Sequence, residues 1–346
     1  MVDLSHFNTL QVPAHAAALL DITSLDDLNK LDSTQPFMFL GEGANVLFTK
    51  DFLGTIARIN LVGKTVVSES DSAVLLDVAA GESWHDLVIW AATQQWSGIE
   101  NMALIPGTVG GAVTGNIAAY GQNQADVVES VRVLDLATKQ SHTLSQHDCR
   151  FFYRESAFKH EFKNKYLITS VRYHLSKTAH YDTSYYSRYE SLEKILRDYA
   201  TPPYSPLDVA RAVIAIRNIK MPDWRVTPTA GSFFKNPFVS KARLADLQIQ
   251  IKELQYYPTE KMLYPHPEDP VFSRSDLVKI PAGRLLDELG WKGKTIGRVG
   301  TFAKHALVII NLGGATGQEI YEFTQAMHTD VKRHFDIDLE YEVQII

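Results

Sequence analysis

A chain of 346 residues with 45% apolar and 21% charged residues has the composition of a globular protein of about two domains. It has no run of about 18 apolar residues, and its first ten residues lack the pattern of a signal peptide, which argues against a membrane protein and predicts a cytoplasmic one. The net charge of -6 without a long basic run argues against nucleic-acid binding, and the single cysteine, Cys149, excludes an internal disulfide and is expected to be buried.

The first half of the chain is predicted to contain both strands and helices. Short strands at Phe37 to Leu40 and Val46 to Phe48 flank a glycine-rich turn, and further strands are expected around Val74 to Val78 and Leu167 to Tyr173. Ser83 is placed to cap a helix with a buried stripe. The stripe consists of Trp84, Leu87, Val88 and Ala91. Without an internal repeat, these patterns favour an α+β fold.

A second unit is predicted to begin near Thr201 to Pro206. Ser205 is placed to cap a helix that starts at Pro206 and ends at Lys220, because serine is a good N-cap and proline is favoured at the first helical position. The buried stripe of this helix is expected to contain Val209, Val213 and Ile216.

Three more helices and a strand are predicted after this point. Ser240 opens one helix, Pro281 to Leu289 forms a second that Gly290 stops, and a capping box of Thr316 and Glu319 opens a third. Their apolar positions are Leu244, Leu247 and Ile251 in the first, and Ile320, Phe323, Met327 and Val331 in the third. Alternating residues from Leu339 to Ile345 predict a final strand with Glu340 and Glu342 on one face.

Two glycine-rich segments lie in the first half of the chain. Gly41 to Asn45 follows a predicted strand, but Val46 replaces the third glycine of a dinucleotide fingerprint and another strand follows, which disfavours a Rossmann domain. Ile105 to Gly121 contains five glycines among small residues, so its backbone can approach a ligand closely. Either segment alone also fits an ordinary turn or packed loop, whereas the two together indicate a diphosphate cofactor.

Six segments resemble, in order and spacing, the signature segments of the UDP-N-acetylenolpyruvoylglucosamine reductases, and the resemblance covers essentially the whole chain. They are Leu40 to Phe48, Glu100 to Gly107, Asn116 to Gly121, Cys149 to His160, Lys220 to Asp223 and Ala230 to Pro237. A run of tyrosines resembles the loop of the longer form of the family. The run consists of Tyr181, Tyr185, Tyr186 and Tyr189.

The resemblance implies an α+β architecture with an FAD-binding fold of the vanillyl-alcohol oxidase type, made of two small subdomains, followed by an α+β substrate-binding domain. The implied domains are residues 12–178 for FAD, divided near 66–72, then a tyrosine-bearing loop at 179–200 and a substrate domain at 203–346. The implied reaction is the NADPH-dependent reduction, via noncovalent FAD, of the enolpyruvyl group of UDP-N-acetylglucosamine enolpyruvate to give UDP-N-acetylmuramate, a step of peptidoglycan synthesis. A monomer is also implied.

The cofactor loops implied by the resemblance combine the two glycine-rich segments. The expected FAD-binding residues are Gly41, Gly43, Ala44, Asn45, Val46, Pro106, Gly107, Thr108, Gly110, Gly111, Asn116, Ala119, Tyr120 and Gly121. The sequence departs from the usual family pattern at Glu42, Ala44, Val113, Gly115 and Ala118. These changes are small or peripheral and leave the backbone cradle intact.

Three residues carry the chemistry that the resemblance implies. Arg154 would steady the substrate carboxylate, because a guanidinium donates two parallel hydrogen bonds, although a surface ion pair with Glu155 is an alternative. Ser232 would donate a proton to the enol carbon, and otherwise it fits a turn residue beside glycine. Glu342 would be an acid that helps Arg154 polarise the carboxylate, but it also fits a solvent-facing strand position.

Other positions are carried over as substrate-binding groups. They are Tyr153, Tyr189, Lys220, Asn236 and Glu288, with Lys220 and Tyr189 expected to face the diphosphate and with Tyr185 or Tyr186 as alternatives to Tyr189. Glu288 stands where many relatives have glutamine, so its charge is expected to weaken or reorganise contacts with the anionic substrate. His305, at the start of a predicted strand, is expected to be structural.

Two other functions remain open from the sequence. An FAD-dependent sugar or alcohol oxidase of the same fold is one, although no histidine or cysteine for a covalent flavin link lies in Gly41 to Thr49. A non-catalytic flavin or nucleotide-sugar sensor is the other, and the joint presence of Arg154, Ser232 and Glu342 argues against it. A metal enzyme is disfavoured because the twelve histidines form no ligand pattern.

Overall fold

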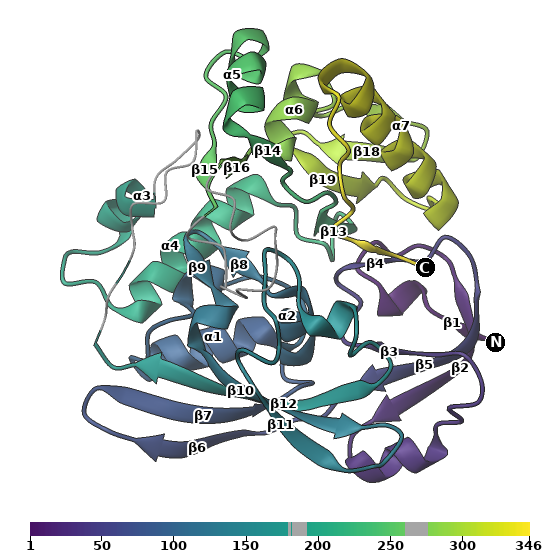
Figure 1. Ribbon diagram of the computed structural model, residues 1–346, viewed down its shortest axis with the longest axis vertical. Helices are drawn as coiled ribbons and strands as arrows, with labels where there is room; N and C mark the ends of the chain where they lie inside the picture. Colours follow the sequence, from purple (N-terminus) through teal and green to yellow (C-terminus); the bar gives the residue numbers. More distant parts are fainter. Residues whose placement is uncertain (179–180, 182–191, 260–275) are drawn as a thin grey trace. The chain divides into compact units, whose positions relative to one another are not determined.

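A computed structural model describes residues 1–178, 181, 192–259 and 276–346 of the chain (Figure 1). These residues divide into two compact units, each described separately below. Unit 1 comprises Met1–Ala18, Gly43–Leu53 and Lys220–Ile346, and unit 2 comprises Leu19–Glu42 and Gly54–Ile219. Both units therefore combine separate stretches of the chain, and those of unit 1 are far apart in the sequence.

Unit 2 is organised around a five-stranded antiparallel sheet of order β11-β10-β12-β7-β6. Its strands are β6 (Lys64–Glu69), β7 (Ala73–Ala79), β10 (Val128–Asp135), β11 (Ser141–Ser145) and β12 (Tyr166–Ser176). Alternate residues of β7 are buried, as expected for a strand with one face against a core. The two strands predicted in this region are confirmed.

Helices α1 (Trp84–Thr93) and α2 (Val109–Gly115) cover one face of this sheet (Figure 1). Ser83 caps α1 as predicted, because its Oγ accepts a hydrogen bond from the N–H of Asp86 at 3.3 Å. The predicted apolar stripe of α1 is fully buried. Trp84 meets Tyr173 of β12 edge-on, with the ring centroids 6.1 Å apart, and so anchors the start of α1 on the sheet.

The rest of unit 2 consists of short strands and two further helices. They are β3 (Phe37–Leu40), the hairpin of β8 (Ala118–Ala119) and β9 (Gln122–Asn123), α3 (Leu192–Tyr199) and α4 (Pro206–Lys220), whose last residue belongs to unit 1. Ser205 opens α4 as predicted, with its Oγ accepting from the N–H of Asp208 at 3.2 Å. β3 lies parallel to β5 (Phe52–Ile59). In unit 1, β1 (Val2–Asp3) pairs antiparallel with the first residues of β2 (His15–Ile22).

Unit 1 contains two larger antiparallel sheets and one short parallel pair. The first sheet has the order β13-β19-β18-β17 and comprises β13 (Thr229–Ser232), β17 (Thr295–Ile296), β18 (Val299–Phe302) and β19 (His305–Asn311). The second has the order β14-β16-β15 and comprises β14 (Phe238–Ser240), β15 (Tyr257–Pro258) and β16 (Leu277–Lys279). The parallel pair joins β4 (Val46–Leu47) to β20 (Gln344–Ile345).

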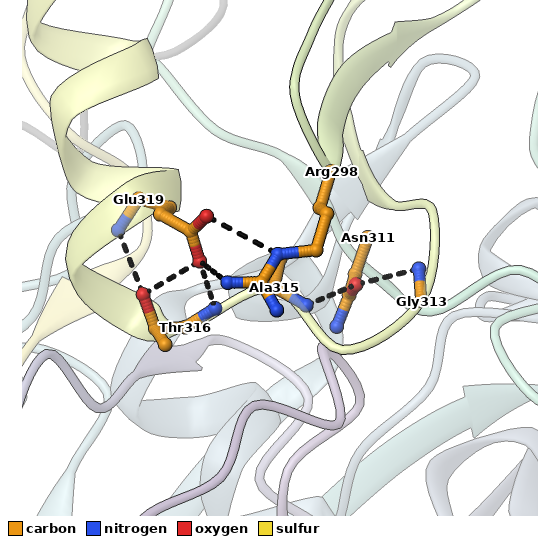
Figure 2. Close-up of polar contacts among 6 residues, drawn as sticks. All are labelled: Arg298, Asn311, Gly313, Ala315, Thr316 and Glu319. Atoms are coloured by element: carbon orange, nitrogen blue, oxygen red, sulfur yellow. Dashed lines mark hydrogen bonds and ion pairs between the residues drawn. The ribbon is translucent and has the colours of Figure 1, made fainter.

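The helices of unit 1 begin within one residue of the predicted starts, and Ile251, predicted in the first helix, lies one residue past its end. They are α5 (Lys241–Gln250), α6 (Ala282–Glu288) and α7 (Gly317–Phe335). Figure 2 shows the capping box of α7: Thr316 Oγ1 accepts from the N–H of Glu319 at 3.2 Å, and the Glu319 carboxylate accepts from the N–H of Thr316 at 2.7 Å. The hydrogen bonds that the Glu319 carboxylate accepts, first from the N–H of Thr316 and then from Arg298, lower the pKa of Glu319 to about 2.

The predicted strand from Leu339 to Ile345 is wrong in most of its length. Regular pairing is confined to Gln344–Ile345, while Tyr341 makes an isolated bridge to Phe234 and the backbone bends at Glu342 and Val343. The bend breaks the alternation of faces, so Glu340 and Glu342 have different surroundings. Sequence periodicity could not reveal this, because the partners of the segment lie at two separate places in the chain.

Two smaller features concern the chain as described. No helix among the described residues is both long enough and apolar enough to cross a membrane. Cys149 is buried as predicted, and burial, with a smaller contribution from Asp148, raises the pKa of its thiol to about 12.

Candidate active site

The first glycine-rich loop turns sharply between β3 and β4. Gly43 has φ of +68°, and a Cβ atom at this position would lie 2.0 Å from the carbonyl oxygen of Phe7. A Cβ at Gly41 would lie 2.6 Å from Oγ1 of Thr108. Both glycines are therefore required by the close approach of other protein atoms.

The backbone of this loop presents a row of hydrogen-bond donors. In the described part of the chain, the N–H groups from Gly41 to Asn45 donate to no protein acceptor. Successive backbone amides of this kind bind phosphate oxygens. The Glu42 carboxylate instead accepts from the N–H of Gly107 at 2.8 Å, which ties the two predicted cofactor loops together within unit 2. Ala44 is half-buried and Val46 is buried.

The second loop is held mainly by the protein itself. Thr108 caps α2 by accepting from the N–H of Gly111 at 3.3 Å, and the N–H of Gly110 donates to the carbonyl of Ala80 at 2.8 Å. A Cβ at Gly110 would lie 3.1 Å from the Cβ of Ala80. The backbone N–H groups in the first turn of α2 therefore donate to protein acceptors. Gly110 allows this helix to pack closely on the strand that precedes Ala80.

Strained backbone gathers at the end of this loop. Asn116 has φ of +39° and its side chain donates to the carbonyl of Phe152 at 2.7 Å, while Tyr120 and Gly121 have φ of +47° and +85°. Non-glycine residues rarely adopt such φ values, and they recur at functional sites. Pro106 and Ala119 are half-buried in the same region.

Arg154 lies in unit 2 and is fixed against the second loop. It has φ of +59°, and its Nη2 donates to the carbonyl of Ala118 at 2.9 Å. Its guanidinium carbon lies 5.5 Å from the centre of the half-buried Tyr153 ring. Glu155, the alternative ion-pair partner, is 2.8 Å from the ring nitrogen of His160.

A second arginine beside Arg154 was missed from the sequence. Arg217 projects from α4, and its buried Nε has no hydrogen-bond partner in the described residues. Burial lowers the pKa of Arg217, its interaction with Tyr120 raises it, and the nearby charge of Arg154 lowers it further. The sequence did contain one indication that Arg217 faces inward. It lies next to Ile216, predicted to be buried, and one turn before Lys220 on the same predicted helix.

Ser232 and Glu342 are brought together in unit 1 by backbone pairing. The N–H of Glu342 donates to the carbonyl of Phe233 at 2.9 Å, so Glu342 lies opposite the residue that follows Ser232. The Ser232 hydroxyl makes no hydrogen bond to the described part of the chain. Glu342 is half-buried, whereas the side chain of Glu340 is 74% exposed and 2.9 Å from Lys235.

The predicted substrate groups have different surroundings. Asn236 Oδ1 accepts from the N–H of Ala282, the first residue of α6, at 2.9 Å and so satisfies one backbone donor at the start of this helix. Glu288 is 2.8 Å from the guanidinium of Arg284 one turn earlier on α6, so its negative charge is compensated. Lys220 is half-buried at the end of α4.

The predictions for His305 and for the tyrosine-bearing loop remain. Nδ1 of His305 accepts from the N–H of Leu307 at 3.2 Å, as expected for a structural residue at the start of β19. Tyr189, with its alternatives Tyr185 and Tyr186, lies outside the described residues. Among those residues, no cluster of histidine, cysteine, aspartate or glutamate is arranged to hold a metal ion.

Comparison with known proteins gives a consistent result. Residues 222–346 match the family model described as UDP-N-acetylenolpyruvoylglucosamine reductase, C-terminal domain, and residues 28–144 match an FAD binding domain. The UDP-N-acetylenolpyruvoylglucosamine reductase of Dechloromonas aromatica is 40% identical over 342 residues, which are 98% of this chain and 96% of that protein. This chain belongs to the UDP-N-acetylenolpyruvoylglucosamine reductase family.

Other members of the family match over similar lengths. The UDP-N-acetylenolpyruvoylglucosamine reductase of Bacteroides fragilis is 37% identical over 348 residues, covering 99% of this chain and 98% of that protein. The crystal structure of the Thermus caldophilus reductase has a TM-score of 0.64 at 24% identity, covering 100% of this chain and 97% of that one. The predicted fold, an FAD-binding domain of the vanillyl-alcohol oxidase type followed by the reductase C-terminal domain, is confirmed.

Proposed function

We infer that this chain catalyses the NADPH-dependent reduction, via FAD, of UDP-N-acetylglucosamine enolpyruvate to UDP-N-acetylmuramate in peptidoglycan synthesis. The observation that carries this conclusion is 40% identity to a UDP-N-acetylenolpyruvoylglucosamine reductase over 98% of the chain. The matches to an FAD-binding domain and to the reductase C-terminal domain agree with it. The alternatives of a sugar oxidase and of a non-catalytic sensor have no comparable support.

The described residues fit a diphosphate cofactor. The amides from Gly41 to Asn45 donate to no acceptor in the described residues, and Thr108, Tyr120 and Gly121 lie on the second loop that the Glu42–Gly107 bond ties to the first. Bound FAD supplies hydride transfer from NADPH to the carbon–carbon double bond of the substrate. The protein supplies position and charge around that transfer.

Each of the three catalytic residues has a distinct proposed role. Ser232 donates its hydroxyl proton to the carbon that gains enolate character, which suits a hydroxyl with no bond to the described chain. Arg154, whose Nη2 is held by the carbonyl of Ala118, binds the substrate carboxylate through its guanidinium. Glu342 acts as an acid that helps Arg154 polarise the substrate carboxylate, and its side chain is half-buried whereas that of Glu340 is exposed.

The substrate is proposed to be bound by Tyr153, Lys220, Asn236 and Glu288, together with Tyr189 of a tyrosine-bearing loop at residues 179–200 that marks the long form of the family. The proposed domains are residues 12–178 for FAD and 203–346 for substrate, which the matched ranges 28–144 and 222–346 support. We place the enzyme in the cytoplasm as a monomer, with no nucleic-acid partner.

An anaerobic visible spectrum of the purified protein tests this proposal. A flavin band that bleaches with NADPH and returns on addition of UDP-N-acetylglucosamine enolpyruvate demonstrates both half-reactions. Ser232→Ala is expected to slow the return by about 10²- to 10⁴-fold, the usual range for a general acid, and to leave the bleaching unchanged. Bleaching reversed by oxygen but not by the sugar would reject the substrate, and a protein that binds no flavin would reject the whole proposal.

A further inference from the structure

Asn45 was expected to be a cofactor residue, but its side chain contacts another part of unit 1. Its Nδ2 donates to the carbonyl oxygen of Glu342 at 2.9 Å, and its own carbonyl accepts from the N–H of Gln344 at 3.0 Å. Two bonds from one residue therefore enclose the bend at Glu342 and Val343. The partners are 297 positions apart in the sequence.

The bend lacks the regular ladder that would otherwise fix Glu342. In a strand, neighbouring backbones hold both the N–H and the carbonyl of each inner residue. Here the N–H of Glu342 is held by the carbonyl of Phe233, and the carbonyl is held by the side chain of Asn45. The Asn45 amide thus replaces the missing ladder bond on one side of Glu342.

Holding both peptide groups of Glu342 restrains the direction of its Cα–Cβ bond, from which its side chain extends. The Phe233 bond sets Glu342 opposite the Ser232–Phe233 segment, and the Asn45 bond prevents rotation of the peptide that follows. A misplacement of about 1 Å in a catalytic constellation can lower the rate by about 100-fold. The Asn45 amide therefore helps to hold the backbone of Glu342 opposite the Ser232–Phe233 segment.

We propose that Asn45 is a positioning residue that holds Glu342 in place beside Ser232, in addition to any contact of its backbone with the cofactor. The inference rests on the catalytic role proposed above for Glu342. It makes the side chain of the first glycine-rich loop part of the protonation machinery. Asn45 then belongs to the cofactor loop through its backbone and holds the acid Glu342 through its side chain.

The same region offers a matched control. Thr49 Oγ1 donates to the carbonyl of Ile346 at 2.7 Å, which is also a side-chain bond from the β4 region to the last residues, but it lies beyond Glu342. Asn45→Ala and Thr49→Val each remove one such bond. Both variants should therefore lower the melting temperature by similar amounts, and they should differ in catalysis.

The test uses the full-length protein loaded with FAD. Flavin content, melting temperature and the two anaerobic half-reactions are measured for Asn45→Ala, Thr49→Val, Glu342→Gln and the Asn45→Ala/Glu342→Gln double variant. Asn45→Ala is expected to retain FAD, to bleach with NADPH at the normal rate and to return with the enolpyruvyl sugar about 10- to 100-fold more slowly. Thr49→Val is expected to keep both rates, and the double variant to be no slower than Glu342→Gln alone.

The outcomes separate the inference from the assignment beneath it. A normal rate of return in Asn45→Ala, or effects of the two substitutions that multiply, would overturn the positioning role. Loss of FAD or slower bleaching in Asn45→Ala would place its function at the cofactor and also overturn it. A normal rate in Glu342→Gln would instead remove Glu342 from the catalytic residues, and with it the reason for positioning it.

Discussion

His305 should make the stability of the enzyme fall in mild acid. Burial, followed by the charges of Lys220 and Lys292 and against the opposing effect of Asp287, lowers its pKa to about 4. Its Nδ1 accepts from the N–H of Leu307, so the neutral ring carries its proton on Nε2 and protonation breaks that bond. In the unfolded chain the pKa is about 6.5.

The sign and size of the effect follow from proton linkage. Below pH 6.5, His305 is protonated in the unfolded chain but stays neutral in the folded protein until the pH approaches 4. The free energy of unfolding therefore has its full contribution from His305 above pH 6.5 and loses it as the pH falls toward 4. Two pKa values about 2.5 units apart give a loss of about 2 kcal/mol between pH 7.5 and pH 5. That is a large share of a typical net stability of about 5–15 kcal/mol.

Urea unfolding at pH 7.5 and pH 5, followed by tryptophan fluorescence, measures this loss. The control is His305→Asn, whose Oδ1 replaces Nδ1 as acceptor for Leu307 and does not titrate. The other titrating groups are the same in both proteins, so the difference between their two losses isolates His305. Equal losses in the wild type and the variant would refute the argument.

Three further predictions concern other groups. Glu42→Gln keeps an acceptor for the N–H of Gly107 and removes a negative charge, so it should bind FAD at least as tightly as the wild type, whereas Glu42→Ala should bind it about tenfold more weakly in a fluorescence titration of apoprotein. Arg284→Ala leaves the Glu288 carboxylate uncompensated and should raise the KM for the anionic sugar by about tenfold, and Glu288→Gln in the same protein should reverse this; an unchanged KM in both would show that α6 does not face substrate. Cys149 should resist a thiol reagent in the native protein and react fully in urea, and rapid labelling of the folded enzyme would contradict its burial.

The helices could be predicted because their signals are local. Ser83, Ser240 and the Thr316–Glu319 pair each act on amides within three residues of themselves, so the sequence contains the complete interaction. Buried stripes at helical spacing then identified the inward faces. The strand predicted at Leu339 to Ile345 failed because its pairing depends on Phe234 and on β4, which no local pattern reports.

The sequence predicted the residues of the candidate site better than it predicted the tertiary contacts between them. The glycine-rich loops and the serine beside two phenylalanines stand out in the sequence, and family resemblance supplied their order. The bond from Asn45 to Glu342, the bond from Ala282 to Asn236 and the burial of Arg217 beside Arg154 depend on tertiary contacts. Local sequence patterns cannot predict these contacts, because their partners lie far apart in the sequence.

The assembly of unit 1 from distant stretches has a consequence for synthesis of the protein on the ribosome. β4 pairs with β20, and Asn45 waits 297 residues for Glu342 to be made. At about 5–20 residues per second, that delay is about 15 to 60 s. During it, residues such as Leu4, Leu10 and Phe48, which are fully buried in the finished fold, have emerged before much of the unit that buries them exists. The stretches of unit 1 that are synthesised before Lys220–Ile346 therefore depend on chaperones or on transient local contacts until that stretch is made.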